Sequence, residues 1–287
     1  MEVKVLGISR SPRFSPNSTA RDEAIFQGVV DALRRSGCHV ERVCEDHFVS
    51  AEGFDRIFSM AREPRVLHEL ALVEEQGVRV VNSAKALLKA TRLSLTETFE
   101  QAGVPVPASP VLFRKEEGKM TMQWRGETHG LLPFPFWLKR SEACAQSAED
   151  VCFVEDEARL NAALEGYCER GIDEVLASEH LVGDLVKFYG VEGTDFFYYY
   201  YPTSDQSFSK FGLEKINGAP SGFPLEAEAL KQCADRAADL CGIVVYGGDC
   251  IVDAAGHFRI IDFNDCPSYS RCCAEAAKAI AEKVRIL

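Results

Sequence analysis

The sequence lacks the signatures of several common enzyme and binding-protein classes. It has 11 cysteines but no CxxC pair, and no cysteine and histidine spacing fits a zinc site. The Walker A and GxGxxG phosphate loops are absent, and so is the GxSxG elbow of serine hydrolases. No Ser/His/Asp or Cys/His constellation indicates a nucleophilic triad. These absences argue against zinc proteins, P-loop and dinucleotide-binding enzymes, and hydrolases that use a side-chain nucleophile.

Positive charge and long apolar runs are also scarce. The formal net charge is -12 and the pI is about 5.1, which disfavours nucleic acid and anionic membrane surfaces as partners. No apolar stretch approaches the roughly 18 residues of a membrane span. Residues 1–8 form a short β-like run without the long apolar core of a signal peptide. The cysteines lie mostly inside apolar segments, so we expect buried, reduced thiols in a cytoplasmic protein.

The first part of the chain alternates strand-like and helix-like segments, which predicts a parallel sheet with helices on its faces. The chain has 287 residues, enough for two or three small lobes with their own cores. The predicted strands are 3–8, 40–43, 55–60 and 78–81, and the predicted helices are 19–35 and 65–76.

The pattern changes between residues 80 and 110 to short strands with fewer helices. A long helix is expected over 84–101, and Gly103 to Pro107 breaks it. The strands expected after it are 121–124, 136–139, 151–154, 175–180, 185–189, 196–201, 247–252 and 258–263. Helices are expected at 157–168, 225–241 and 274–284, and a loop at 202–223. The predicted fold class is therefore an α/β parallel-sheet domain followed by α+β lobes with largely antiparallel sheets.

The most informative segment is a predicted hairpin with acidic side chains on one face. Asp262 and Asn264 are two positions apart on its second strand, so both side chains point to one face, and Ile261 and Phe263 to the other. Asp249 on the first strand can lie opposite them. Carboxylate and amide oxygens are the ligands that Mg²⁺ prefers, and a cation relieves the repulsion between two carboxylates. The flanking residues are strongly apolar, so we interpret the pattern as a Mg²⁺ site, with Mn²⁺ as a second option, rather than a solvated hairpin face.

The step of thirteen positions from Asp249 to Asp262, followed by Asn264, resembles the metal-binding signature of the ATP-grasp superfamily. That superfamily includes D-alanine–D-alanine ligase, glutathione synthetase, ribosomal-protein glutamate ligases and inositol-phosphate kinases. The resemblance implies ATP as a second ligand. It also implies an N-terminal α/β domain at 1–82, a linker helix and small lobe at 83–183, and a C-terminal lobe with the metal site at 184–287.

Further candidate ATP ligands follow in family order. The helix after Val80–Ser83 carries Arg92 where the family usually has a phosphate-contacting lysine. Lys139 ends an apolar strand, so its ammonium needs a polar partner, and the resemblance implies a nucleotide phosphate. The segment from Arg140 to Ser147 has no glycine, unlike the family's phosphate-covering loop, and Arg140 is expected to substitute in part.

Residues 176–184 resemble the hinge between the two nucleotide-binding lobes. The resemblance implies contacts of Glu179 and Leu181 with adenine, of Asp184 with ribose, and of Lys187 with the phosphates. We expect His180 to be a packed or solvent-tipped histidine rather than a catalyst.

The resemblance implies a ligase that phosphorylates a small-molecule carboxylate, after which an amine attacks the acyl phosphate. Lys187 and Arg271 are the candidate catalytic cations. A small-molecule kinase on the same fold and a non-catalytic nucleotide-binding protein are the alternatives, and a homodimer is left open. The candidate substrate contacts are surface cations, namely Arg13, Arg62, Lys210, Lys215 and Arg271.

Overall fold

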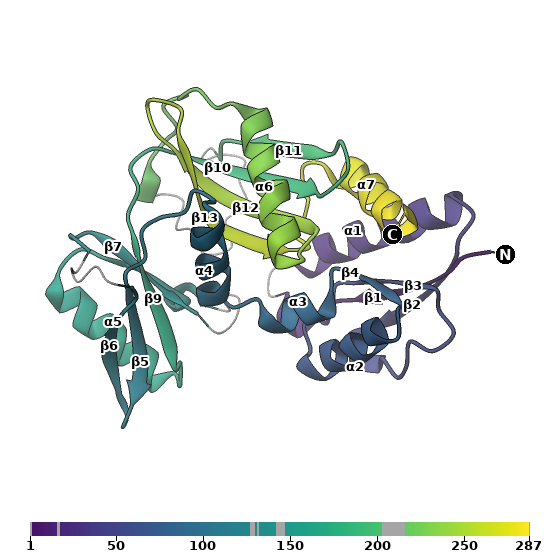
Figure 1. The fold of residues 1–287 in the computed structure, drawn as a ribbon, viewed down its shortest axis with the longest axis horizontal. Helices are drawn as coiled ribbons and strands as arrows, with labels where there is room; N and C mark the ends of the chain where they lie inside the picture. The colour runs from purple at the N-terminus through teal and green to yellow at the C-terminus, as the bar shows by residue number, and fades with distance from the viewer. Residues whose placement is uncertain are drawn as a thin grey trace.

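The computed structural model describes residues 2–15, 18–126, 130, 132–141, 147–202 and 216–286. Three sheets, which we name A, B and C in chain order, lie within these ranges. Sheet B lies at the left end of the view in Figure 1 and sheet A at the right, with sheet C above and between them. No helix in these ranges is long and apolar enough to cross a bilayer. The predicted succession of a parallel α/β part and a largely antiparallel part is confirmed.

Sheet A is parallel, with the strand order β2-β1-β3-β4. Its strands are β1 (Lys4–Ser9), β2 (His39–Cys44), β3 (Arg56–Ser59) and β4 (Arg79–Val81), and its helices are η1 (Pro12–Phe14), α1 (Thr19–Arg35), η2 (Glu45–His47) and α2 (Pro64–Glu75). Side chains alternate along each strand, so the sheet buries apolar residues on both faces. One face packs against α2 and the other against α1.

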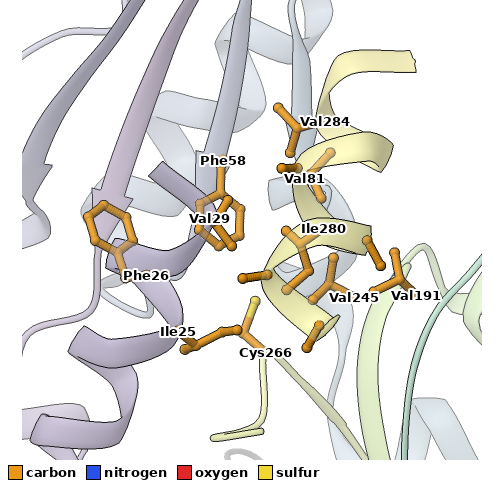
Figure 2. Packing of buried hydrophobic residues seen from close by; sticks show 14 of the residues in the cluster. Ile25, Phe26, Val29, Phe58, Val81, Val191, Val245, Cys266, Ile280 and Val284 are labelled. Atoms are coloured by element: carbon orange, nitrogen blue, oxygen red, sulfur yellow. The ribbon is translucent and has the colours of Figure 1, made fainter. Parts of the chain in front are cut away.

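The last helix of the chain, α7 (Cys273–Ile286), returns to the core of sheet A. It lies beside α1 in Figure 1, and Figure 2 shows Ile280 and Val284 packed near Val29 and Phe58. A Cβ atom at Gly28 on α1 would lie 2.9 Å from the Cβ of Ala277 on α7, so the glycine permits the close approach of the two helices. The C-terminal segment is therefore part of the packing of the N-terminal sheet.

Sheet B is antiparallel, with the order β6-β5-β9-β7-β8. Its elements are β5 (Val111–Glu116), β6 (Lys119–Trp124), β7 (Phe136–Arg140), η3 (Ala148–Asp150), β8 (Val151–Val154), α5 (Glu157–Glu169) and β9 (Glu174–Glu179). Strand β5 was not predicted, because its apolar run is only three residues long and charged residues follow. Helix α5 covers the face that carries Phe136 and Leu138, so Trp137 and Lys139 face the opposite way, toward sheet C.

Sheet C is antiparallel, with the order β11-β10-β12-β13. Its elements are β10 (Asp184–Val191), β11 (Phe197–Tyr200), α6 (Ala227–Cys241), β12 (Val245–Val252) and β13 (Phe258–Asp265). Helices α6 and α4 (Arg92–Ala102) cover the face that carries Phe188, Cys250 and Phe263. The other face, which carries Lys187 and Asp249, is turned toward sheet B.

The single helix predicted over 84–101 is wrong, because two helices, α3 (Ala84–Lys89) and α4, replace it. Thr91 begins α4 with a capping box: its side chain accepts from the Ser94 amide, and the Ser94 hydroxyl accepts from the Thr91 amide. Arg92 is therefore the first residue of a helix rather than a mid-helix residue. The break between α3 and α4 directs the Arg92 side chain toward sheet C.

Asn82 links sheet A to sheet C. Its side chain is buried, donates to the Val245 carbonyl at 2.9 Å and accepts from the Val245 amide at 2.7 Å. We expect Asn82→Ala to lower the free energy of unfolding by roughly 1–3 kcal/mol, because the Val245 amide would remain buried without a partner, while the Val245 carbonyl keeps its bond from the Cys266 amide. Asn161→Ala on the exposed side of α5 is the matched control in urea denaturation. Equal midpoints for the two variants would show that the Asn82 bonds contribute nothing.

Candidate active site

A cleft of about 1110 Å³ lies between the facing surfaces of sheets B and C and extends to the end of sheet A. One part of its wall is aliphatic and consists of Leu181, Leu185, Ile251 and Ile261. Polar and charged side chains converge beside this wall. An apolar cavity with a few convergent polar groups is typical of a small-molecule site.

Three charged residues form a row across sheet C. Lys187 on β10 is paired in register with Asp249 on β12, and Asp249 is paired with Asp262 on β13. The Lys187 ammonium lies 3.1 Å from a carboxylate oxygen of Asp249. The structure therefore brings together the side chains that the hairpin pattern predicted on one face, and adds a cation to the row.

A β-bulge at Ile261 changes one detail of that prediction. Asp249 is opposite Asp262 but Cys250 is opposite Ile260, so β13 has one extra residue. Ile261 was expected on the face opposite Asp262, but it packs with Leu185 and Ile251 in the aliphatic wall of the cleft. The bulge also leaves the Ile261 carbonyl free to accept a hydrogen bond from outside the sheet.

Asp262 is held by partners from two other elements. Arg92 donates to one carboxylate oxygen at 2.9 Å, and the Asn264 amide donates to the other at 2.7 Å. Burial alone raises the pKa of the Asp262 carboxyl, but the charges of Arg92 and Lys139 outweigh it and hold the pKa below its ordinary value. Asp262 is therefore a carboxylate at neutral pH.

Lys139 is buried, with 8% of its surface exposed, and donates to the Ile261 carbonyl at 2.9 Å. Burial lowers its pKa to about 8, helped by the nearby charge of Arg92 and opposed by Asp262 and Asp249. A buried ammonium with a lowered pKa gains from any additional anion placed against it. This is the environment expected of a phosphate-binding lysine.

The oxygen donors of this face fit Mg²⁺. No group of three or more His, Cys, Asp or Glu side chains that could hold a metal occurs among the described residues. Two carboxylates, of Asp249 and Asp262, and the amide oxygen of Asn264 remain as donors. Mg²⁺ is commonly bound through one or two carboxylates, with water and substrate phosphates completing its shell. The donor set therefore fits a metal that arrives with a nucleotide better than a closed structural site.

The predicted hinge residues differ in their positions. Glu179 and Leu181 line the cleft, although the Glu179 carboxylate is bonded to Arg259 at 2.8 Å. Asp184 does not line it. Its carboxylate is 3% exposed and accepts hydrogen bonds from the backbone amides of residues 221–223. These bonds account for Asp184 as a structural residue and do not support the predicted ribose contact.

Two other predicted cations lie outside the cleft lining. The Arg140 guanidinium is 3.7 Å from Asp150, and only the Arg140 carbonyl reaches the site, where it accepts from Arg92. Arg271 lies over the ring of Tyr200 at 4.1 Å, next to the charged row. Lys210, Lys215 and residues 142–146 of the glycine-free segment lie outside the described residues.

The arm of the cleft at sheet A contains the predicted substrate contact Arg62 and two residues to which the sequence patterns assigned no role, Arg10 and Asp265. Arg10, after β1, bonds Asp22 at 3.1 Å and Asp265 at 3.4 Å. Asp265 also bonds Arg62, which follows β3. The carboxyl ends of β1 and β3 are neighbours where the strand order changes direction, which is where open α/β sheets bind ligands. From the sequence, Arg10 could have been found only by applying this rule to the residues that follow the predicted strands.

Comparison with known proteins gave matches to solved structures only: no family model and no curated protein matches the chain. A RimK domain ATP-grasp protein from Sphaerobacter thermophilus matches with a TM-score of 0.63 and 17% identity, over 99% of this chain and 100% of that chain. D-alanine–D-alanine ligase from Bacillus anthracis, solved with ATP, matches with a TM-score of 0.67 and 13% identity, over 99% and 96%. The ATP-grasp ligase PsnB, solved with a minimal precursor, matches with a TM-score of 0.59 and 15% identity, over 100% and 99%. At these identities the likeness is one of fold.

Proposed function

We propose that this chain, which has the ATP-grasp fold, is a Mg-ATP-dependent ligase that activates a small-molecule carboxylate as an acyl phosphate for attack by an amine. The observation that carries the proposal is the convergence of Asp249, Asp262 and Asn264 with Arg92, Lys139 and Lys187 in one cleft. The structural neighbours, two of which are named as ligases, support the same reaction class.

The charges of this group favour a metal–nucleotide complex over either component alone. Three cationic side chains surround two carboxylates, so the group carries one net positive charge. Free Mg²⁺ meets a positive field, and free ATP meets two carboxylates. Mg-ATP places the metal at the carboxylates and the phosphates at the cations, so both sets of charges are compensated.

In this proposal Asp249, Asp262 and Asn264 hold the metal, which neutralises charge that develops on the transferred phosphoryl group. Lys139 and Arg92 bind phosphate oxygens from the other side, and Lys187 is the cation paired with Asp249. The adenine ring of ATP lies at the hinge of Glu179 and Leu181, against the aliphatic wall. The position between two sheets limits the access of water, which reduces hydrolysis of an acyl phosphate.

We place the acid to be activated in the arm of the cleft at sheet A. Arg10 and Arg62 converge on Asp265, the residue after Asn264, so this arm adjoins the metal site. The buried Glu45 holds the loops in place by accepting from the backbone amides of Ser11 and Arg62. Guanidinium groups on a fixed backbone suit a carboxylate substrate.

The product assay distinguishes this reaction from phosphoryl transfer to a hydroxyl group. With a panel of amino acids and other small acids plus amines, a ligase releases ADP and phosphate together. A kinase releases ADP while the phosphate stays on the product. ADP formed without free phosphate would replace the ligase proposal with the kinase alternative.

We expect Mg²⁺ and ATP together to raise the melting temperature, because a ligand that binds only the folded state stabilises it. ATP in EDTA should give little or no rise, since its phosphates then face Asp249 and Asp262 without a metal. The measurement is a thermal denaturation series with ATP, Mg²⁺, both, and both plus EDTA. An equal rise with metal-free ATP would remove the metal from the site.

A further inference from the structure

An aromatic group lies on the sheet B side of the cleft, near the hinge. Trp137 and Lys139 are two positions apart on β7, so both point into the cleft. The Trp137 ring lies 4.9 Å from that of Phe153 on the neighbouring strand and 6.2 Å from that of His180. His180 also lines the cleft and separates the two hinge residues, Glu179 and Leu181.

A hydrogen bond from Trp137 determines which nitrogen of the neutral His180 ring carries the proton. The indole Nε1 of Trp137 is 3.2 Å from Nδ1 of His180. An indole nitrogen only donates, so Nδ1 accepts, and the proton of the neutral imidazole is on Nε2. Burial lowers the pKa of His180, which keeps the ring neutral at physiological pH.

The Nε2–H group of His180 makes no hydrogen bond to any residue that the structure describes. It is a donor in a partly buried position, and such groups normally have an acceptor. On the opposite side are Leu185 and Ile251 of the aliphatic wall, which offer no polar atoms. The space between the aromatic and aliphatic walls suits a flat heteroaromatic base, whose ring nitrogens are acceptors.

We propose that His180, oriented by Trp137, is a specificity-determining residue that donates from Nε2 to a ring nitrogen of the purine base of the nucleotide. The inference rests on the proposed function, because it requires the nucleotide to bind in this cleft. It leaves the expectation of a packed, non-catalytic His180 in place and adds a contact with the nucleotide. Trp137 is a positioning residue, since it acts through the histidine.

The test uses ATP analogues that each lack one ring nitrogen, namely 1-deaza-, 3-deaza- and 7-deaza-ATP, and isothermal titration calorimetry with Mg²⁺. Wild-type protein should bind at least one analogue about five- to tenfold more weakly than ATP, the effect expected for one lost hydrogen bond. His180→Gln and His180→Asn form a matched pair. The longer glutamine amide reaches the position of Nε2, and the asparagine amide reaches only that of Nδ1.

His180→Gln should keep the discrimination against that analogue, and His180→Asn should bind it and ATP equally. Trp137→Phe keeps an aromatic ring and removes the indole donor, so it should shift the discrimination toward that of His180→Asn even if the histidine variants fold poorly. An unchanged analogue profile in both His180→Asn and Trp137→Phe would overturn the inference while ATP binding, and the proposed function, stand. Absence of ATP binding by the wild-type protein would overturn the proposed function itself.

Discussion

Asp262→Asn should reverse the metal dependence of ATP binding. The substitution keeps the size of the side chain but removes a negative charge and a metal ligand. Affinity for Mg-ATP should fall by about 100-fold or more, since a bound metal contributes several kcal/mol. Affinity for metal-free ATP should rise, because Arg92 and Lys139 then face the phosphates without the competing carboxylate.

Calorimetric titrations with ATP in Mg²⁺ and in EDTA measure both effects. Asp253→Asn is the matched control, because it makes the same change of charge in the same hairpin, at the exposed turn between β12 and β13. This control should bind like the wild-type protein under both conditions. A fall of equal size in Mg²⁺ and in EDTA would mean that Asp262 supports the nucleotide site but does not hold a metal.

The same variant should also lose some stability without ligand. Asp262 is 31% exposed, and Arg92 and Lys139 favour its charged form in the folded state. Removing the carboxylate leaves these cations less well compensated, at a cost of roughly 1–2 kcal/mol. Denaturant midpoints must therefore accompany the titrations. The opposite signs expected in Mg²⁺ and in EDTA cannot result from partial unfolding, which weakens both.

Lys139→Met is expected to weaken Mg-ATP binding by about 10- to 100-fold, the effect of losing a charge-assisted hydrogen bond to phosphate. The unliganded protein should become more stable by about 1–2 kcal/mol, because it no longer holds a desolvated ammonium whose pKa is lowered to about 8. Methionine fills the same space without charge. Opposite changes in affinity and stability are the expected result.

The pH dependence of stability provides a second readout for this lysine. Its pKa is about 8 when folded and has the ordinary lysine value of 10.5 when unfolded, so the unfolded chain binds more protons between these values. The free energy of unfolding of the wild-type protein should therefore increase as pH rises from 8 to 10.5. The Met variant should not show this increase. Below pH 8 the buried Lys139 ammonium destabilises the folded protein by its full amount.

Lys115→Met is the control for these measurements. Lys115 also lies in sheet B and donates to a backbone carbonyl, that of Cys168 at 3.2 Å, but it does not line the cleft. This variant should bind Mg-ATP like the wild-type protein. If Lys139→Met also retains the wild-type affinity, Lys139 does not contact the nucleotide.

Local patterns predicted most of the fold because each depends on near neighbours in sequence. The alternation along β12 and β13 placed Asp249, Asp262 and Asn264 on one face, and the structure has them there. The bulge at Ile261 was not predictable, because alternation alone does not reveal an extra residue in one strand. Its effect is large, since it frees the carbonyl that Lys139 binds.

Long-range contacts account for the rest of what the sequence did not predict. The partners of Asp184 lie more than 35 residues away, and those of Arg10 include Asp265 at the other end of the chain. Local sequence patterns cannot reveal either pairing, because the partners are far apart in the chain. The break before Arg92, in contrast, was readable: Thr91 and Ser94 have the spacing of a capping box.

A crystal structure with Mg²⁺ and a non-hydrolysable ATP analogue tests the central claim most directly. We predict that the metal is bound by oxygens of Asp249, Asp262 and Asn264, with Lys139 on a phosphate and the base at the hinge beside His180. A metal held elsewhere, or a nucleotide bound outside this cleft, would contradict the account.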